Sequence, residues 1–265
     1  MSPLLRVRGP QAAAEDSRAA TGQAEPTDRK ERRAIAQAEA KVESTGPAKG
    51  MAIKVIAAWV LLPLFFLATG GSVAWWEAWV YCVILLGPMT VFLVYMARHD
   101  PEFIARRTKL REKERTQRRI LVWGYPSLIA ALVIPGLDHR FGWSEPPAAA
   151  VVAAMAIVFG GYLTVLLVFV ENRWAGRTVE VFAEQKVIST GPYAIVRHPM
   201  YTGTTALYLA TPVALGSWWA LIPALTFIPI FVLRIRNEEE VLIRDLPGYA
   251  EYRQRVRYRL VPFVW

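Results

Sequence analysis

Residues 148–170 read AAAVVAAMAIVFGGYLTVLLVFV and contain no charged side chain. An α-helix rises about 1.5 Å per residue, so about 20 apolar residues cross the hydrocarbon core of a bilayer, which is about 30 Å thick. Backbone groups inside lipid must bond to one another, and a helix satisfies them within one segment. The stretch therefore predicts a membrane-spanning helix.

Apolar runs of similar length recur on both sides of this stretch. The last of them, residues 204–233, is too long for one span and contains Pro212, Gly216 and Pro223, which favour a break. It predicts two tightly connected helices that turn near residues 215–218. The whole chain is predicted to be an all-α polytopic membrane protein with about six transmembrane helices, the last two forming a helical hairpin. The other expected spans are residues 52–69, 79–97 and 120–137.

The basic side chains are distributed unevenly between the loops. Residues 98–119 are dense in Arg and Lys, whereas residues 70–78 contain neither. Because basic loops stay on the cytoplasmic side, we expect both termini and residues 171–203 in the cytoplasm, and residues 138–147 outside. Amphipathic Trp rings prefer the membrane–water interface, so the outer interface is expected to hold Trp75, Trp76, Trp79, Trp143, Trp218 and Trp219.

The first 50 residues differ in composition from the rest of the chain. They carry few large apolar side chains, so we expect residues 1–50 to be a disordered or transiently helical extension. They lack the apolar run of a secretory signal, and Met51, which leads directly into the first span, is a candidate for the true start. The expected organisation is this extension, four transmembrane helices within residues 51–170, and a functional region at residues 171–265.

Two features of the composition exclude other classes of protein. The net charge is +9, but the basic residues lie between apolar runs, which is typical of membrane topology and not of a nucleic-acid-binding domain. Cys82 is the only cysteine and lies inside an apolar run, so the chain can form neither a disulfide framework nor a cysteine-based metal site.

Two segments are rich in polar and aromatic residues that membrane anchoring does not require. The first is STGPYAIVRHPMYTG at residues 189–203, whose Gly-Pro and His-Pro steps disfavour a continuous helix before Tyr201 and leave backbone groups available to bond a ligand. The second is RIRNEEE at residues 234–240, directly after the last span. On a helix, Arg234 and Glu238 share one face. We expect the two segments to meet on the cytoplasmic side and to form the functional site.

Together these segments resemble the isoprenylcysteine carboxyl methyltransferase family, which is related to the phospholipid N-methyltransferases. The resemblance rests on Gly-Pro-Tyr-x-x-x-Arg-His-Pro-x-Tyr-x-Gly from Gly191, Arg-x-x-x-Glu-Glu-x-x-Leu from Arg234, Gly-Tyr-x-x-Tyr from Gly248 and Arg-Leu-Val-Pro from Arg259. Separated motifs in the family's order are more specific than any one alone. Residues 171–175, Glu-Asn-Arg-Trp-Ala, also look like bacterial relatives, for which the inner membrane is the expected location.

The resemblance implies a site for S-adenosylmethionine (SAM) and methyl transfer to the carboxylate of an isoprenylcysteine-like or other lipophilic acceptor. In the family, the arginine four residues before the Glu pair helps to bind the acceptor, which places that role on Arg234; Arg173 is a second candidate. Family members commonly have His-Leu-Val where this chain has residues 185–188, so we expect main-chain contacts there. The implied cofactor-binding residues are Gln185, Lys186, Val187, Ile188, Tyr193, His198, Pro199, Met200, Tyr201, Glu238 and Glu239.

The chemistry of SAM agrees with these residue types. Its sulfonium and ammonium groups are cations, which the carboxylate of Glu238 can neutralise and the rings of Tyr193 or Tyr201 can contact. A carboxylate acceptor is already ionised, so the displacement needs neither a metal nor a general base, and the planar guanidinium of Arg234 suits such an acceptor. The protein would contribute proximity, alignment and exclusion of water.

The same residues also have plainer structural interpretations. Arg197 and His198 are typical of an interfacial pair that contacts lipid phosphates, and Arg234 of an anchor at the inner membrane surface. Tyr249 and Tyr252 are more typical of packing residues that hold the C-terminal tail against the rest of the chain.

Three alternative functions stay open at the level of sequence. A phospholipid N-methyltransferase shares the general plan, although an amine acceptor favours a carboxylate over Arg234. An NADPH-dependent sterol-type reductase needs a site for a 2′-phosphate, for which Arg197 and Lys186 are candidates. A non-enzymatic scaffold would use the basic loop and tail to hold membrane lipids or partners.

Overall fold

The computed structural model describes residues 29–100, 115–172, 174–175, 181 and 184–265. The chain divides into two units, Met1–Gly46 and Pro47–Trp265. Within the described residues every regular element is helical, in agreement with the predicted all-α class. The elements are α2 (Arg29–Gly70), α3 (Trp76–His99), α5 (Arg115–Phe141), α6 (Ala148–Glu171), the 3₁₀ helix η1 (Gly191–Ala194), α7 (Pro199–Ala214), α8 (Leu221–Leu225), α9 (Phe227–Asp245) and α10 (Tyr249–Arg255).

Three helices of the described residues are long and apolar enough to cross a membrane: Gly50–Gly70, Trp76–His99 and Ala148–Glu171. They confirm helices at residues 52–69, 79–97 and 148–170 that have the length and composition of the predicted spans. The first span is the continuation of α2, whose helical backbone already begins at Arg29 in the first unit. The total number of crossings and the orientation in the membrane stay predictions.

The proline-containing runs behave differently from one another. Pro126 and Pro135 lie inside α5, which stays helical from Arg115 to Phe141. In the last apolar run, α7 ends at Ala214, and Gly216 then adopts a φ of +81°, which favours glycine because it has no Cβ. The chain turns there and continues through the short α8 into α9.

The most extensive helix–helix contact in the described residues is between α6 and α7. Gly161 and Gly203 face one another in this contact: a Cβ on Gly161 would lie 2.6 Å from the carbonyl oxygen of Gly203, and a Cβ on Gly203 would lie 2.5 Å from that of Gly161. Small residues let two backbones approach closely in membrane helices. The last glycine of the His-Pro-x-Tyr-x-Gly motif is therefore required by packing, which brings the start of α7 against the middle of α6.

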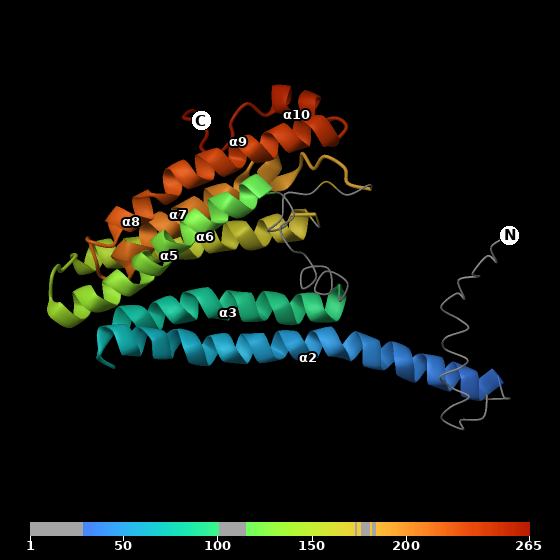
Figure 1. Cartoon of the computed structure of the whole chain (residues 1–265), viewed down its shortest axis with the longest axis horizontal. Helices are drawn as coiled ribbons and strands as arrows, with labels where there is room; N and C mark the ends of the chain where they lie inside the picture. The colour runs from blue at the N-terminus through green and yellow to red at the C-terminus, as the bar shows by residue number, and fades with distance from the viewer. Residues whose placement is uncertain (1–28, 101–114, 173, 176–180, 182–183) are drawn as a thin grey trace, which may run out of the picture. The chain divides into compact units, whose positions relative to one another are not determined.

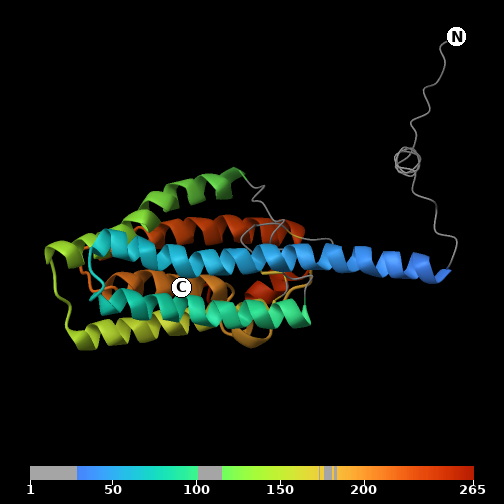
Figure 2. The same ribbon diagram turned by 90° about the horizontal axis from the view of Figure 1, so that it is seen from below.

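The main apolar core joins the first two spans to α6 and α7. Phe66 of α2 packs edge-on against Tyr81 of α3, whose hydroxyl forms a 2.8 Å hydrogen bond with Thr211 of α7. Figure 2 shows α3 lying along α6, and the contacts between these two helices agree with that view.

Trp75 corrects one expectation of the sequence. The sequence predicts Trp75 at the outer membrane interface, but its side chain lies in the core and is 1% exposed. It stacks on His139, and its Nε1 donates a hydrogen bond to the carbonyl of Leu215. Trp76, Trp143, Trp218 and Trp219 are exposed, as an interfacial position requires. Trp75 ends up inside because the turn after α7 supplies a partner for its indole N–H.

One end of the second unit is fastened by a buried carboxylate. Asp138, near the end of α5, is fully buried and accepts hydrogen bonds from the backbone and hydroxyl of Ser144 and from the hydroxyl of Ser217. It thereby ties the α5–α6 link to the turn after α7. Figure 1 shows both links at one end of the helices and α10 at the opposite end. The polar and aromatic motifs at the start of α7, at the end of α9 and in α10 lie at that opposite end.

Replacing Gly161 by Ala is expected to lower the midpoint of thermal unfolding, because the added methyl group would collide with the α7 backbone. Overpacking of this kind costs roughly 1–3 kcal/mol. Gly160→Ala is the matched control, because a Cβ at Gly160 meets nothing within 4 Å. Unfolding in detergent can be followed by the reaction of the buried Cys82 with a thiol-specific dye. Equal midpoints for the two variants would contradict the close contact of α6 with α7.

Candidate functional site

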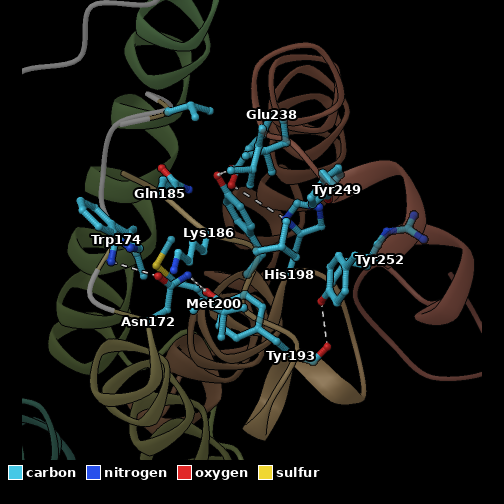
Figure 3. A pocket seen from close by; sticks show the side chains of 18 residues that line it. Asn172, Trp174, Gln185, Lys186, Tyr193, His198, Met200, Glu238, Tyr249 and Tyr252 are labelled. Carbon is cyan, nitrogen blue, oxygen red and sulfur yellow. Dashed lines mark hydrogen bonds and ion pairs between the residues drawn. The ribbon is translucent and has the colours of Figure 1, made fainter. Parts of the chain in front are cut away.

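A cavity that is partly open to solvent lies at the α10 end of the helices. Its walls come from the segment after α6, the start of α7, the last turns of α9, and α10. Figure 3 shows Trp174 and Gln185 on one side of the cavity and Tyr249 and Tyr252 on the other. The lining residues are Asn172, Trp174, Ala175, Val181, Gln185, Lys186, Val187, Ile188, Tyr193, Arg197, His198, Met200, Tyr201, Glu238, Leu242, Leu246, Tyr249 and Tyr252.

The backbone of residues 189–203 folds as its Gly-Pro and His-Pro steps suggest. Gly191 has a φ of +56°, η1 ends at Ala194, and α7 begins at Pro199. Proline suits the first position of a helix, where its missing N–H has no intrahelical partner. The helix therefore starts two residues before Tyr201, with His198 at its N-cap and buried against the cavity.

The C-terminal tail holds this backbone from the other side. The N–H of Arg197 donates to the carbonyl of Tyr258, and that of His198 to the carbonyl of Arg259, both at 2.9 Å. The hydroxyl of Thr202 donates to the carbonyl of Leu260 at 2.7 Å. The tail thus uses main-chain groups to fix the Arg-His-Pro motif, and the family-like closing Arg-Leu-Val-Pro has a structural role.

The carboxylate of Glu239 is the centre of a buried charge cluster. Its Oε1 accepts a hydrogen bond from Nε of Arg197 at 2.7 Å and lies 3.4 Å from Nε2 of His198, while its Oε2 accepts from Nε of Arg259 at 2.8 Å. Burial alone would favour the neutral acid, but the hydrogen bonds from His198 and Arg259 and the charge of Arg197 lower the pKa of Glu239 from 4.5 to about 2. Glu239 is therefore ionised and joins α9, the start of α7 and the tail.

Glu238, the neighbouring residue, faces the cavity instead. Its Oε2 accepts a hydrogen bond from the hydroxyl of Tyr201 at 2.8 Å, and its Oε1 lies 4.0 Å from Nδ1 of His198. The hydroxyl of Tyr201 in turn accepts from Nε of Arg234 at 2.6 Å, and the guanidinium of Arg234 also lies over the Tyr201 ring. Arg234, Tyr201 and Glu238 form one hydrogen-bonded chain that runs from a buried arginine to the cavity.

The aromatic lining of the cavity is held in place by its own hydrogen bonds. Asn172 donates to the hydroxyl of Tyr193 at 3.0 Å, and the hydroxyl of Tyr252 donates to the carbonyl of Tyr193 at 2.8 Å. Burial, together with the negative charges of Glu238 and Glu171, raises the pKa of Tyr193 to about 12. Burial and the charge of Glu238 also raise the pKa of Tyr201. Both phenols are therefore neutral near pH 7 and are suited to donating hydrogen bonds, not to acting as bases.

The structure brings most of the predicted site residues together and places a few elsewhere. Pro199 begins α7 but does not line the cavity, and Glu239 is buried in the charge cluster. Arg234 is also buried, does not line the cavity, and bonds to the hydroxyl of Tyr201. Arg173 lies outside the described residues. The predicted cofactor-binding residues that line the cavity are Gln185, Lys186, Val187, Ile188, Tyr193, His198, Met200, Tyr201 and Glu238.

Several residues that line the cavity have no ligand-binding role in the predictions from the sequence. Leu242 carried a usable signal, because it lies four residues after Glu238 and a helix places both on one face. The tyrosines of the Gly-Tyr-x-x-Tyr motif were interpreted as packing residues, although both line the cavity. Asn172, Trp174 and Ala175 lie in the Glu-Asn-Arg-Trp-Ala stretch that resembles bacterial relatives, whereas Val181 and Leu246 reach the cavity only through the fold.

Arg197 forms hydrogen bonds within the protein that neither of its interpretations from the sequence includes. Besides Glu239, it donates from Nη1 to the carbonyls of Val256 and Arg257 at 3.0 and 2.9 Å, and Arg197 is only 6% exposed. A guanidinium engaged in this way does not suit contact with lipid phosphates or recognition of a 2′-phosphate. The geometry thus weakens the reductase alternative.

Comparison with known proteins points in the same direction as the geometry. Residues 149–246 match the family described as phospholipid methyltransferase, which includes membrane methyltransferases of the isoprenylcysteine type. Over 144 residues the chain is 26% identical to the nickel-cobalt-cadmium resistance protein NccN of Alcaligenes xylosoxydans xylosoxydans; the alignment covers 53% of this chain. It covers 63% of that relative, just under two thirds of its length. The family match supports a membrane methyltransferase, a coarser conclusion than the predicted isoprenylcysteine family.

Replacing Glu239 by Gln is expected to lower the midpoint of thermal unfolding strongly. The change leaves Arg197 and Arg259 without their shared anion, and breaking a buried ion pair by removing one partner costs roughly 3–5 kcal/mol. The exposed Glu240 provides a matched control as Glu240→Gln. Comparable losses in the two variants, measured by Cys82 reactivity in detergent, would contradict the central role of Glu239.

The lowered pKa of Glu239 also predicts how this stability difference varies with pH. A carboxylate with a depressed pKa stabilises the fold fully above its unfolded value of 4.5, and the stabilisation is lost as the pH falls toward about 2. The difference in midpoint between wild type and Glu239→Gln should therefore be constant above pH 4.5 and shrink below it. A difference that stays constant on acidification would contradict the depressed pKa.

Proposed function

We propose that this chain is an integral membrane methyltransferase that transfers the methyl group of SAM to a carboxylate oxygen of an isoprenylcysteine-like or other lipophilic acceptor. The observation that carries the proposal is the hydrogen-bonded chain from Arg234 through Tyr201 to Glu238. The phenol of Tyr201 links the guanidinium of Arg234, which can bind an anion, to the carboxyl group of Glu238, which can bind a cation. A reaction between an anionic acceptor and a cationic methyl donor needs this pairing of charges in adjacent positions.

The residues around the cavity fit SAM as a ligand. Glu238 offers a carboxylate to the ammonium or sulfonium, and Tyr193 and Tyr201 offer neutral aromatic faces nearby. SAM supplies the activated methyl group when it is bound. Residues 185–188 border the cavity, and we expect them to contact the remaining polar groups of the cofactor.

Arg234 is proposed to bind the carboxylate of the acceptor. It is 6% exposed, so its guanidinium acts in a low-dielectric environment where a charged hydrogen bond is strong. Its bond to Tyr201 fixes the orientation of the planar fork. Because an ionised carboxylate is already nucleophilic, the residues contribute alignment and exclusion of water, effects worth up to about 7–11 kcal/mol in well-oriented systems.

Phospholipid N-methylation is the second candidate, and the family match at residues 149–246 is the observation that favours it. An amine acceptor would be attracted to Glu238 and repelled by Arg234. The two candidates therefore differ in which of these side chains faces the acceptor, and they give chemically different products.

A direct test incubates the detergent-solubilised full chain with SAM labelled in its methyl group and a lipid extract of the native membrane. Carboxyl methylation gives an ester, from which base releases labelled methanol, whereas a methylated amine keeps its label in base. Label that base releases supports the proposal. A base-stable lipid product would establish the amine alternative, and absence of both SAM binding and label transfer would refute a methyltransferase.

Replacing Glu238 by Gln is expected to weaken SAM binding by roughly 10- to 100-fold, because a hydrogen bond to a charged group contributes about 1.5–3 kcal/mol. The unfolding midpoint should change little, since Glu238 lies at the cavity surface. Titration calorimetry with SAM measures the affinity, and Glu240→Gln again serves as control. Identical titration curves for Glu238→Gln and wild type would remove Glu238 from the site.

Replacing Arg234 by Ala is expected to reduce methyl transfer at least as strongly while changing SAM affinity less, since Arg234 reaches Glu238 only through Tyr201. Arg236→Ala is the matched control, because Arg236 lies on the same helix with an exposed side chain. Steady-state rates at saturating SAM separate the two effects. Normal turnover and a normal acceptor KM for Arg234→Ala would defeat its assignment.

A further inference from the structure

The hydroxyl of Tyr249 is buried and has no hydrogen-bond partner among the described residues. The residue is 4% exposed, yet its side chain lines the candidate cavity. Leaving a buried polar group unpaired costs about 1–3 kcal/mol, so such groups normally have a partner. An unpaired hydroxyl at the wall of the candidate cavity points to a partner on a ligand bound there.

Tyr252, one turn further along α10, provides the contrast. It is equally buried and lines the same cavity, but its hydroxyl donates to the carbonyl of Tyr193 at 2.8 Å. The second tyrosine of the Gly-Tyr-x-x-Tyr motif is therefore a structural residue. The first tyrosine of the motif, Tyr249, has a hydroxyl that forms no hydrogen bond with any described residue.

The change in polarity along one face of α9 indicates which part of a bound ligand would lie near Tyr249. Arg234, Glu238 and Leu242 follow at intervals of four residues, and Leu246 follows after four more at the end of the helix. Each step advances about 6 Å along the helix axis. The face thus changes from a cation, through an anion, to apolar side chains as it approaches α10.

The apolar end of this face forms a wall together with α10. Leu246, Tyr249 and Tyr252 make one buried cluster, against which Val187 and Leu242 pack. Such a wall disfavours the charged amino-acid end of SAM, for which Glu238 is the complementary group. It suits the uncharged adenosine end, whose flat base is largely apolar and whose ring nitrogens and ribose oxygens accept hydrogen bonds.

We propose that Tyr249 binds the nucleoside half of the methyl donor, with its phenol donating a hydrogen bond to an adenosine nitrogen or oxygen. The inference rests on the proposed function, because it assumes that SAM occupies this cavity. It orders the ligands along α9: the acceptor carboxylate at Arg234, the cationic part of SAM at Glu238, and adenosine against Leu242 and Tyr249. Burial and the nearby charge of Glu239 raise the pKa of Tyr249, which keeps the phenol a donor at neutral pH.

The test compares Tyr249→Phe with the matched variant Tyr252→Phe in the full chain. Tyr249→Phe should weaken binding of S-adenosylhomocysteine by about 3- to 10-fold in titration calorimetry. Its unfolding midpoint should stay the same or rise, because the variant removes an unpaired buried hydroxyl. Tyr252→Phe should lower the midpoint, because it leaves the Tyr193 carbonyl without its donor.

Fragments of the cofactor locate the lost contact. Protection of the fold against heat by adenosine should be weaker in Tyr249→Phe than in wild type, while protection by L-methionine should be equal. Leu242→Ala, which opens the same wall, should show the same selectivity for adenosine and provides a second variant if Tyr249→Phe does not accumulate. Loss of methionine protection alone would place Tyr249 at the other end of the ligand and overturn the proposal.

The outcomes separate this inference from the proposed function. If wild type binds S-adenosylhomocysteine and Tyr249→Phe binds it equally well, the assignment of Tyr249 is wrong and its hydroxyl is satisfied by water, while the methyltransferase proposal stands. If wild type binds neither S-adenosylhomocysteine nor SAM, the proposed function fails and the inference fails with it.

Discussion

The ionised carboxylate of Glu239 is the interaction on which the rest of the site depends. One side chain binds Arg197 from the segment before α7 and Arg259 from the C-terminal tail, while His198 lies beside it. These partners are 42 and 20 residues away from Glu239 in the chain. A buried carboxylate that lost one of these cations would carry an uncompensated charge, so the three segments are held as a unit.

This cluster explains why two adjacent glutamates have different roles. Successive side chains on a helix point about 100° apart, so Glu239 faces the packed tail when Glu238 faces the cavity. The first is enclosed by cations of the protein and keeps a low pKa, whereas the second lines the candidate cavity. Helix geometry alone thus directs one glutamate into the packed interior and its neighbour to the cavity.

The remainder of the fold presents this site at one end of a helical membrane unit. The close approach of Gly161 to Gly203 sets α7 against α6, and the buried Asp138 joins the loops at the far end. Neither group lies in the cavity. Both nevertheless fix where the Arg-His-Pro motif and the acidic end of α9 come together, because rigid helices transmit position over their whole length.

The helical class, three helices long and apolar enough to span a membrane, and two segments that supply about a third of the cavity lining could all be predicted from the sequence alone. These follow from local properties: the length of an apolar run, the conformational limits of Gly-Pro and His-Pro steps, and the spacing of Arg234 and Glu238 on one helix face. Three further features emerge only in three dimensions. Trp75 is a core residue, Arg197 and Glu239 stabilise the fold, and Tyr252 has a hydrogen-bond partner in the protein that Tyr249 lacks among the described residues. Those distinctions depend on which hydrogen-bond partners lie across the cavity or in the tail, and residue type and spacing do not contain that information.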